Sequence, residues 1–420
     1  MSNSSRREFL KKASALGLVT ATTPFESMLQ AAMRTGAPNS GQSIVCIYLR
    51  GGADWLNIIA PYKDKEYAEV RPTLALEKAD GPVELDADWG LHPAMRSLEP
   101  LWAERMLAPI VAVGSPHTTR SHFDAQDFME FAAPGNRTVR SGWLNRFLAE
   151  SQDKESSSFR AMAMQELLPR SLRGEYPVLA VPSGMDRKQG AKTLNRFEEF
   201  YGGGAGEMPA GEMPGEMDRP EDAAGIVKSG KVTIETLRRY QEILAKGKTE
   251  VKYPGGRFSQ RLAAMAKVLK AGEGLEVAGL DYGGWDDHAN QGSAEGRQAT
   301  RLKDVADSLA AFCRDMGPKM KTTTIVVMTE FGRTVRENGN GGTDHGHGGG
   351  MFVIGGGVRG GKVYGDWQGL KPERLYQGRD LQVTTDFRDV FHSVLDGTFD
   401  FKVPKGFFPD YKSKKISGMY

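Results

Sequence analysis

Cysteine is scarce in this sequence: two occur in 420 residues, Cys46 in an apolar stretch and Cys313 in a helical one. Neither lies near the amino terminus, so no thiol there is available to carry a lipid anchor. We expect both cysteines to be buried as small hydrophobic side chains rather than joined in a disulfide bridge. With so few thiols, a metal site in this chain depends on nitrogen and oxygen ligands.

The sequence also lacks a long hydrophobic run and a strong excess of either charge. Its apolar amino-terminal stretch, residues 13–23, is too short to span a bilayer, so we expect no stable membrane span. The formal net charge is +2, and residues 1–31 carry four basic side chains against two acidic ones, which leaves the remainder near neutral. Because nucleic-acid binding needs a basic face, this composition argues against a nucleic-acid partner.

The first residues carry an export motif. Paired arginines with a following Phe-Leu stand in Ser5-Arg6-Arg7-Glu8-Phe9-Leu10-Lys11, ahead of the weakly apolar stretch. This pattern is typical of a twin-arginine signal, and we expect residues 1–31 to be removed after transport by the twin-arginine translocase. The alternative is a basic amphipathic helix at the amino terminus. The motif predicts a periplasmic or secreted protein.

Short β-branched runs alternate with longer helical periods, which predicts an α/β fold with a doubly wound, mostly parallel sheet and helices on both faces. Strands are expected at Ser43–Leu49, Pro109–Val113, Val178–Val181, Val277–Leu280, Thr323–Thr329 and Met351–Ile354. Helices are expected at His92–Ala103, His122–Phe131, Gly142–Ser151, Val232–Ala245, Phe258–Ala271, Gln298–Met316 and Asp386–Leu395. We expect one domain over residues 40–420, with a small flexible insert at about 202–252 that begins with a degenerate Gly-Glu-Met-Pro repeat.

The first predicted strand runs into Arg50-Gly51-Gly52-Ala53-Asp54. Paired glycines directly after a strand permit a tight turn and a close approach of the backbone. Asp54 would then project over the edge of the sheet, where it could bind a metal. The alternatives are that Asp54 caps the next element or forms a local ion pair with Arg50.

Ser121 stands at the start of a predicted helix, with Asp124 at the capping-box offset. A hydroxyl at a helix amino terminus also suits a nucleophile, because the free backbone amides and the dipole stabilise an anion. Arg120 could hold a substrate oxyanion there. His117 and His122 flank the hydroxyl, and two imidazoles are more than helix capping needs.

Acidic and imidazole side chains follow the later predicted strands. The candidates are Asp286 and His288 after Val277–Leu280, Glu330 and Arg333 after Thr323–Thr329, and Asp344, His345 and His347 in a glycine-rich loop. Because open α/β sheets bind ligands beyond the carboxyl ends of their strands, we expect these side chains to meet at one edge. His92 and His392 are weaker candidates, one as a helix start and the other as a packed helix residue.

Imidazole mixed with carboxylate indicates a particular class of metal ion. Without thiolates, this ligand set suits zinc or a similar divalent cation, or a harder one such as manganese, magnesium or calcium. The residues leave open whether one or two ions bind. The sequence therefore predicts a divalent metal site at the sheet edge.

The same residues carry a family resemblance. The motifs are the twin-arginine leader, Arg50-Gly51-Gly52-Ala53-Asp54, Leu91-His92-Pro93, Arg120-Ser121-His122-Phe123-Asp124-Ala125-Gln126-Asp127, Gly283-Gly284-Trp285-Asp286, Glu330-Phe331-Gly332-Arg333-Thr334 and Gly342-Thr343-Asp344-His345-Gly346. Together they resemble the domain-of-unknown-function 1501 family over nearly the whole mature chain. That family is similar to the alkaline phosphatase and sulfatase superfamily, which implies two metals in many members. The resemblance implies site roles for Asp54, Ser121, Asp286, His288, Asp344 and His345.

The chain also departs from the superfamily pattern. An Asp-His pair after a late strand stands here as Glu330-Phe331, which keeps the carboxylate and loses the imidazole. Either His345 or His347 compensates from the loop, or one metal site is gone. No Cys-x-Pro-x-Arg sequence occurs, so the formylglycine route of arylsulfatases is excluded.

Two functions remain. The first is metal-dependent hydrolysis of a phosphate or sulfate ester on a small molecule or glycan, with Ser121 or a metal-bound water as nucleophile. Arg120 and Arg333 would then hold the anionic group. The second is a non-catalytic periplasmic binding protein on a degenerate form of the fold.

Overall fold

The computed structural model describes residues 41–151, 157–181, 192, 194–195 and 220–420. An eight-stranded sheet lies at its centre, in the order β11-β5-β10-β9-β1-β8-β6-β7. Every strand is parallel to its neighbours except β10, which runs antiparallel to both β9 and β5. The strand bounds are β1 Ser43–Arg50, β5 Leu107–Gly114, β6 Ala161–Ala163, β7 Leu179–Ala180, β8 Val277–Gly283, β9 Thr323–Met328, β10 Gly349–Gly355 and β11 Thr385–Asp386.

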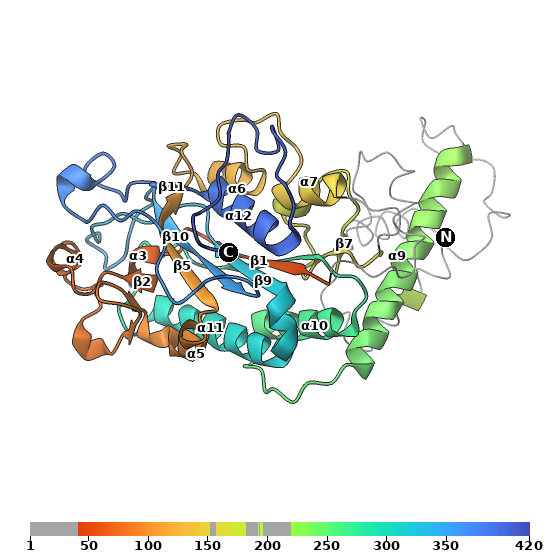
Figure 1. Ribbon diagram of the computed structural model, residues 1–420, viewed down its shortest axis with the longest axis horizontal. Coiled ribbons are helices and arrows are strands. Elements are labelled where there is room, and N and C mark those ends of the chain that lie inside the picture. Colours follow the sequence, from red (N-terminus) through yellow and green to blue (C-terminus); the bar gives the residue numbers. More distant parts are fainter. Residues whose placement is uncertain (1–40, 152–156, 182–191, 193, 196–219) are drawn as a thin grey trace, which may run out of the picture.

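Helices cover both faces of this sheet, and β1 shows why. Side chains alternate between the two faces of a strand, and all residues from Ser43 to Leu49 are buried. Val45 and Ile47 pack in a core shared with α5, α10 and α11, whereas Ile44 and Cys46 pack in a second core with α6, α7 and α12. Figure 1 shows these two groups of helices on opposite sides of the sheet. The predicted doubly wound α/β fold is confirmed.

The helices of the two layers have well-defined bounds. They are α5 Glu99–Ala103, α6 His122–Glu130, α7 Trp143–Glu150, α10 Arg257–Ala271, α11 Arg297–Met316 and α12 Phe387–Phe399. All six predicted strands are present. The helix expected from His92 begins instead with 3-10 turns at Pro93–Leu98, where Met95 leaves helical geometry, and becomes α-helical only in α5. Strands β6 and β11 were not predicted, because two or three residues are too few to show a period.

Smaller elements complete the fold. A three-stranded antiparallel sheet joins β2 Ile59–Ala60, β4 Gly90–Leu91 and β3 Val83–Glu84, and the short helices α3 Trp55–Ile58 and α4 Lys65–Val70 follow β1. Further 3-10 turns lie at Lys78–Asp80, Arg170–Leu172, Gly317–Thr322 and Pro372–Arg374. Cys46 and Cys313 are buried and free, as expected.

The predicted leader and the repeat at 202–219 fall outside the described residues. The rest of the predicted insert contains helix α9, Pro220–Lys246, whose carboxyl-terminal half adds Leu237 and Tyr240 to the core around α10. Figure 1 shows α9 at the end of the molecule opposite α3 and α4. In the part of the chain that the structure describes, no helix has the length and apolar character needed to cross a bilayer.

Candidate metal centre

Four chain segments bring polar side chains to one edge of the sheet. Strands β8 and β9 end there and lead to Asp286 and Glu330, and β5 leads to His122 at the start of α6. Strand β10 is antiparallel to β5 and β9, so it begins at the edge where those strands end. The loop that precedes β10 therefore brings His345 to the same edge. The residues that follow parallel strands therefore meet as the sequence predicted.

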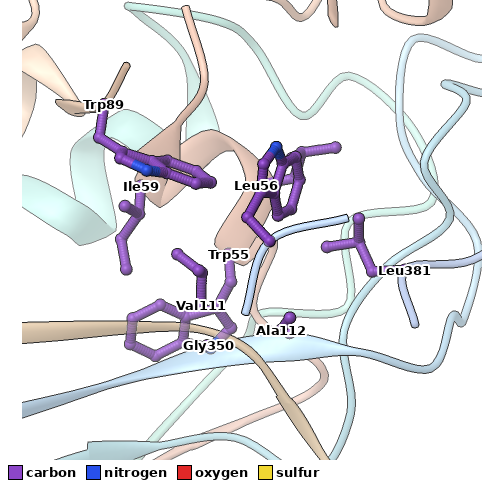
Figure 2. Close-up of a pocket in the computed structure, with 10 residues that line it drawn as sticks. Trp55, Leu56, Ile59, Trp89, Val111, Ala112, Gly350 and Leu381 are labelled. Carbon is purple, nitrogen blue, oxygen red and sulfur yellow. The ribbon is translucent and has the colours of Figure 1, made fainter. Parts of the chain in front are cut away.

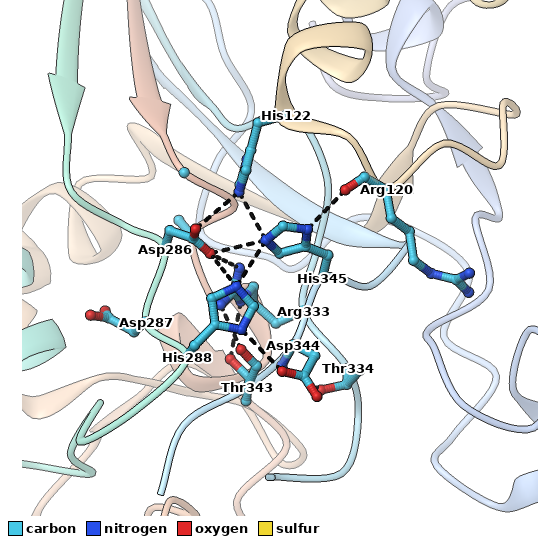
Figure 3. A network of polar contacts seen from close by, with 12 residues as sticks. Arg120, His122, Asp286, Asp287, His288, Arg333, Thr334, Thr343, Asp344 and His345 are labelled. Carbon is cyan, nitrogen blue, oxygen red and sulfur yellow. Dashed lines mark hydrogen bonds and ion pairs between the residues drawn. The ribbon is translucent and has the colours of Figure 1, made fainter. Parts of the chain in front are cut away.

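Three histidines and one aspartate form a compact cluster (Figure 3). Ligand atoms of His122, Asp286 and His345 all lie within 4.8 Å of one another. Nε2 of His345 lies 3.0 Å from Nε2 of His122 and 3.1 Å from Oδ1 of Asp286. Nε2 of His288 lies 3.0 Å from Nε2 of His345 and 2.9 Å from Oδ1 of Asp286. We call these four residues the metal centre.

The other nitrogen of each imidazole faces a hydrogen-bond acceptor. Nδ1 of His345 lies 2.8 Å from the carbonyl oxygen of Arg120. Nδ1 of His122 lies 2.7 Å from Oε1 of Glu330, and Nδ1 of His288 lies 3.0 Å from Oδ1 of Asp344. A carbonyl or carboxylate oxygen only accepts, so these contacts place the proton of each neutral ring on Nδ1.

This arrangement leaves the Nε2 lone pair of His345 facing those of His122 and His288. Lone pairs repel at such distances unless a proton or a cation lies between them. In a tetrahedral zinc site with bonds of about 2.0–2.1 Å, ligand atoms are about 3.3 Å apart, close to the separations here. Imidazole ligands backed by a carboxylate or a backbone carbonyl are also the usual form of such sites. The donor set fits a divalent cation.

The charges around the centre hold Asp286 ionised. Burial would raise the pKa of Asp286, but the Arg333 guanidinium donates to Oδ1 at 2.8 Å and lowers the pKa to about 2. Burial would lower the pKa of His122, but the hydrogen bond to Glu330 and the charge of Asp286 raise it overall. Burial lowers the pKa of His345, which favours the neutral ring.

Glu330 holds His122 rather than joining the cluster. Its carboxylate is fully buried, and Oε1 accepts from His122, from the backbone amide of Gly51 at 2.9 Å and from Gln126 at 3.0 Å. Gln126 lies one helical turn after His122, so both side chains reach the same oxygen. Phe331 packs beside the rings of the centre, 4.8 Å from His122 between centroids. Of the two loop histidines, His345 is the one whose ring lies in the cluster.

The loops carrying Arg333 and His345 are packed backbone against backbone. These two residues form an antiparallel bridge, and the amide of Gly346 donates to the carbonyl of Gly332 at 2.9 Å. A Cβ atom added at Gly346 would lie 2.4 Å from the backbone of Arg333, and one at Gly332 would lie 1.8 Å from a carbonyl oxygen of the facing loop. Only glycine therefore fits at these two positions while the loops keep this distance.

Asp54 does not lie in the metal centre. Its carboxylate is buried in an ion pair with Arg71, whose Nη2 donates to Oδ1 at 2.9 Å, and Oδ2 also accepts from Gln291 at 2.7 Å. Arg71 follows the end of α4, and its side chain is fully buried. Both carboxylate oxygens of Asp54 therefore have partners within the protein. We therefore remove Asp54 from the ligand set, and its ion pair is with Arg71 rather than with Arg50.

Two other expected ligands take different positions. Asp344 contacts the centre only through His288, and its pKa is lowered because hydrogen bonds from His288 and Asn338 outweigh the effect of burial. His347 stacks on Tyr376 with 4.4 Å between ring centroids, and neither ring nitrogen has a hydrogen-bond partner in the described structure. Neither Asp344 nor His347 belongs to the four-residue cluster.

The expected catalytic side chains have partners of their own. Ser121 is the exposed N-cap of α6, and its hydroxyl accepts from the amide of Asp124 at 3.5 Å. Arg333 is buried and donates to Asp286 and Thr343, so it supports the centre instead of reaching solvent. Arg120 pairs with a buried aspartate, and Figure 3 shows its guanidinium pointing away from the cluster while its carbonyl faces His345.

The remaining histidines are structural. His92 caps the 3-10 turn that follows it, by accepting from Ala94 at 3.1 Å. His117 accepts from Thr119, and His392 in α12 contacts Ser413 at 2.8 Å.

Sequence reasoning did not identify Arg71, Gln126 or Arg379 as residues that support the site. The Nη2 atom of Arg379 donates to the carbonyl of His345 at 3.1 Å. Of these, only Gln126 carries a sequence signal, because it follows His122 at the spacing of one helical turn. Arg71 and Arg379 act through tertiary contacts that no local pattern shows.

The metal centre is open to solvent. Side-chain exposure is 41% for Asp286 and 46% for His288. A separate apolar cavity of about 10 Å³ lies over β5 and β10, lined by Trp55, Trp89 and other hydrophobic side chains (Figure 2). That volume holds about one water and no organic substrate.

A family profile described as Protein of unknown function (DUF1501) matches residues 41–405. The chain belongs to this family. The matched range includes the whole metal centre and all but the last residues of the described structure, which places the family's sequence features on the fold described above. A comparison with curated proteins finds no match.

A comparison with solved structures finds several with a partly similar trace. A protein in the alkaline phosphatase superfamily from Vibrio parahaemolyticus is 9% identical, with a TM-score of 0.38 over 93% of this chain and 82% of that one. Phosphonate monoester hydrolase SpPMH from Silicibacter pomeroyi is 10% identical, with a TM-score of 0.38 over 89% and 75%. PsFucS1 sulfatase from Pseudoalteromonas sp. is 13% identical, with a TM-score of 0.37 over 95% and 76%. Similarity at this level carries no argument about activity.

Proposed function

We propose that this protein is an exported hydrolase of phosphate or sulfate esters that depends on one divalent cation held by His122, Asp286, His288 and His345. The observation that carries the proposal is that Nε2 of His345 lies 3.0 Å from Nε2 of both His122 and His288, while each of the three rings is fixed through Nδ1. Three nitrogens and one carboxylate oxygen suit zinc best. Manganese, magnesium and calcium prefer more oxygen ligands than this centre offers.

The partners of the other predicted ligands support the binding of a single ion. Asp54 is neutralised by Arg71, and Asp344 is engaged with His288. No second group of carboxylate and imidazole ligands is assembled around either residue in the described structure. The centre therefore calls for one equivalent of metal per chain.

When bound, a divalent cation would polarise the ester oxygens and lower the pKa of a coordinated water. The chain's own residues keep the centre ready for this. Arg333 keeps Asp286 ionised, and Glu330 and the Arg120 carbonyl fix the orientation of His122 and His345. We propose water as the attacking group, because the centre is open to solvent. Ser121, exposed and adjacent to His122, is the alternative nucleophile, and Ser121→Ala separates the two: activity is kept if water attacks.

The mature chain, purified with the leader removed, provides the direct test. Elemental analysis should find one zinc per chain, and aryl phosphate or aryl sulfate should be hydrolysed in a reaction that a chelator stops. His345→Ala and Asp286→Asn should lose the metal, whereas His392→Gln, in the distant helix α12, should keep it. A folded protein that binds no divalent cation would sink the proposal.

The second candidate is a periplasmic binding protein without turnover, which the open position of the centre also suits. A stoichiometric metal without hydrolysis of either ester class would favour it. Export itself is tested separately: replacing Arg6 and Arg7 by lysine should stop transport of the chain, because the translocase recognises the arginine pair.

A further inference from the structure

A second group of polar side chains lies beside the metal centre. The carboxylate of Asp380 is fully buried, and Oδ2 accepts from Nη2 of Arg120 at 2.6 Å. Arg379 also contacts Asp380, with 3.2 Å between Nη1 and Oδ1. Two guanidinium groups share one carboxylate, so the group carries one positive charge in excess.

The two arginines remain accessible. Their side chains are 33% exposed for Arg120 and 40% for Arg379, although Asp380 between them has no exposure. One guanidinium group would be enough to neutralise the charge of one aspartate, and here there are two. Arg120 also donates to Gln377 and Arg379 to the carbonyl of His345, and each guanidinium keeps further N–H groups that can bind a ligand at the surface.

A buried imidazole lies next to this pair. His347 is 8% exposed, stacks on Tyr376 and has Asp380 and Arg120 among its nearest charged groups. No residue of the described structure forms a hydrogen bond with either ring nitrogen, so both are available to a ligand. An anion bound between the arginines would give the N–H of His347 an acceptor.

The position of the group ties it to the metal centre. The carbonyl of Arg120 receives Nδ1–H of His345 at 2.8 Å, and Arg379 donates to the carbonyl of His345 at 3.1 Å. The guanidinium of Arg120 points away from the cluster (Figure 3), so it does not face an ester bound at the metal. A ligand held by these arginines would lie beside the metal centre and not in it.

We infer that Arg120, Arg379 and His347 form an oxyanion subsite that binds a second acidic group of the substrate, separate from the ester at the metal centre. The chemistry it recognises is that of a sulfate, phosphate or carboxylate, because planar guanidinium groups match those oxygens. The substrate class is thus an ester that carries at least two anionic groups. This inference depends on the proposed function in one respect, which is that the bound anion is taken to be part of the substrate.

Sulfate titration of the mature chain tests the subsite, first with zinc and then after chelation. Sulfate should bind in both states, and Arg379→Gln should weaken the binding about tenfold or more, because charged hydrogen bonds are lost. His347→Phe, which keeps the stacking on Tyr376, should also weaken it. Arg374→Gln is the control, since Arg374 is an exposed arginine of the same segment outside the subsite. Repeating the titration with acetate shows whether a carboxylate is accepted.

Two results would overturn the inference. Sulfate affinity unchanged in both Arg379→Gln and His347→Phe, in protein that melts normally, would mean that Arg379 only supports the loop. Sulfate binding that disappears on chelation would place the anion at the metal instead. Loss of zinc binding alone would count against the proposed function and leave the subsite intact.

Discussion

Replacing Glu330 by glutamine is the sharpest test of the metal centre. The substitution keeps the size of the side chain and removes the negative charge from a fully buried position. Oε1 of Glu330 accepts from three donors, namely His122 at 2.7 Å, Gly51 at 2.9 Å and Gln126 at 3.0 Å. Glutamine keeps this oxygen, but a neutral amide oxygen accepts more weakly than a carboxylate, and its amide nitrogen would replace Oε2, which lies 3.0 Å from the Thr329 hydroxyl.

The expected effect follows from the role of Glu330 behind His122. Removing a carboxylate that orients a metal-bound imidazole costs about 10–100-fold in metal affinity. That range corresponds to about 1.4–2.7 kcal/mol of binding free energy. The loss should appear in the zinc dissociation constant, measured by competition with a chromophoric chelator.

Glu337→Gln provides a matched control. The carboxylate of Glu337 also accepts three hydrogen bonds, from Thr73 at 3.0 and 2.9 Å and from Leu74 at 2.9 Å, but it contacts no histidine. We expect this variant to lose some stability and keep its zinc affinity. If Glu330→Gln, correctly folded, binds zinc within twofold of the parent protein, the assigned role of Glu330 is wrong.

Three further outcomes are expected. Arg71→Met should lower the free energy of unfolding, measured by urea denaturation, by about 3–5 kcal/mol, because it leaves the buried charge of Asp54 unpaired. Adding Asp54→Asn to this variant should recover part of the loss. An unchanged urea midpoint in Arg71→Met would contradict this. Gly51→Ala would place a Cβ atom 2.7 Å from the backbone nitrogen of Asp286 and should weaken zinc binding. Gly283→Ala is the control and should not weaken it, because the space around a Cβ atom there is open. Equal effects of the two substitutions would refute the steric argument. Because the pKa of His122 is raised, protons should compete with zinc from a higher pH than at an ordinary histidine of about 6.5, so affinity should fall as pH drops through that raised pKa. Zinc titrations between about pH 5 and 8 would show it, and removing the Glu330 charge should move the fall to lower pH.

The fold was largely predictable because its strands are buried on both faces. A strand such as β1 becomes a continuous apolar run that stands out against the helical periods around it. The antiparallel direction of β10 has no such sign, because pairing direction is decided by connections between elements. Yet that direction is what brings His345 to the edge where the other strands end.

The site was predictable in its residue types and less so in their roles. Asp286, His288 and His345 could be selected from their position after strands and in a glycine-rich loop. The sequence could not show that Asp54 meets Arg71, since the partner is supplied by the packing of α4 and not by spacing. Nor could it tell which of two nearby loop histidines turns toward the cluster. In the structure, the bridge to Arg333 selects His345.

The backbone contact between the loops of Arg333 and His345 bears on which cations the protein can accept. To admit a larger ion or more coordinating oxygens, the loops would have to give up the bridge between Arg333 and His345 and the hydrogen bond from Gly346 to Gly332. Calcium needs about six to eight oxygen neighbours at about 2.3–2.6 Å, and a rigid nitrogen-rich cluster cannot rearrange to supply them. Discrimination against calcium would then be set by the packing of glycines that do not themselves bind the cation.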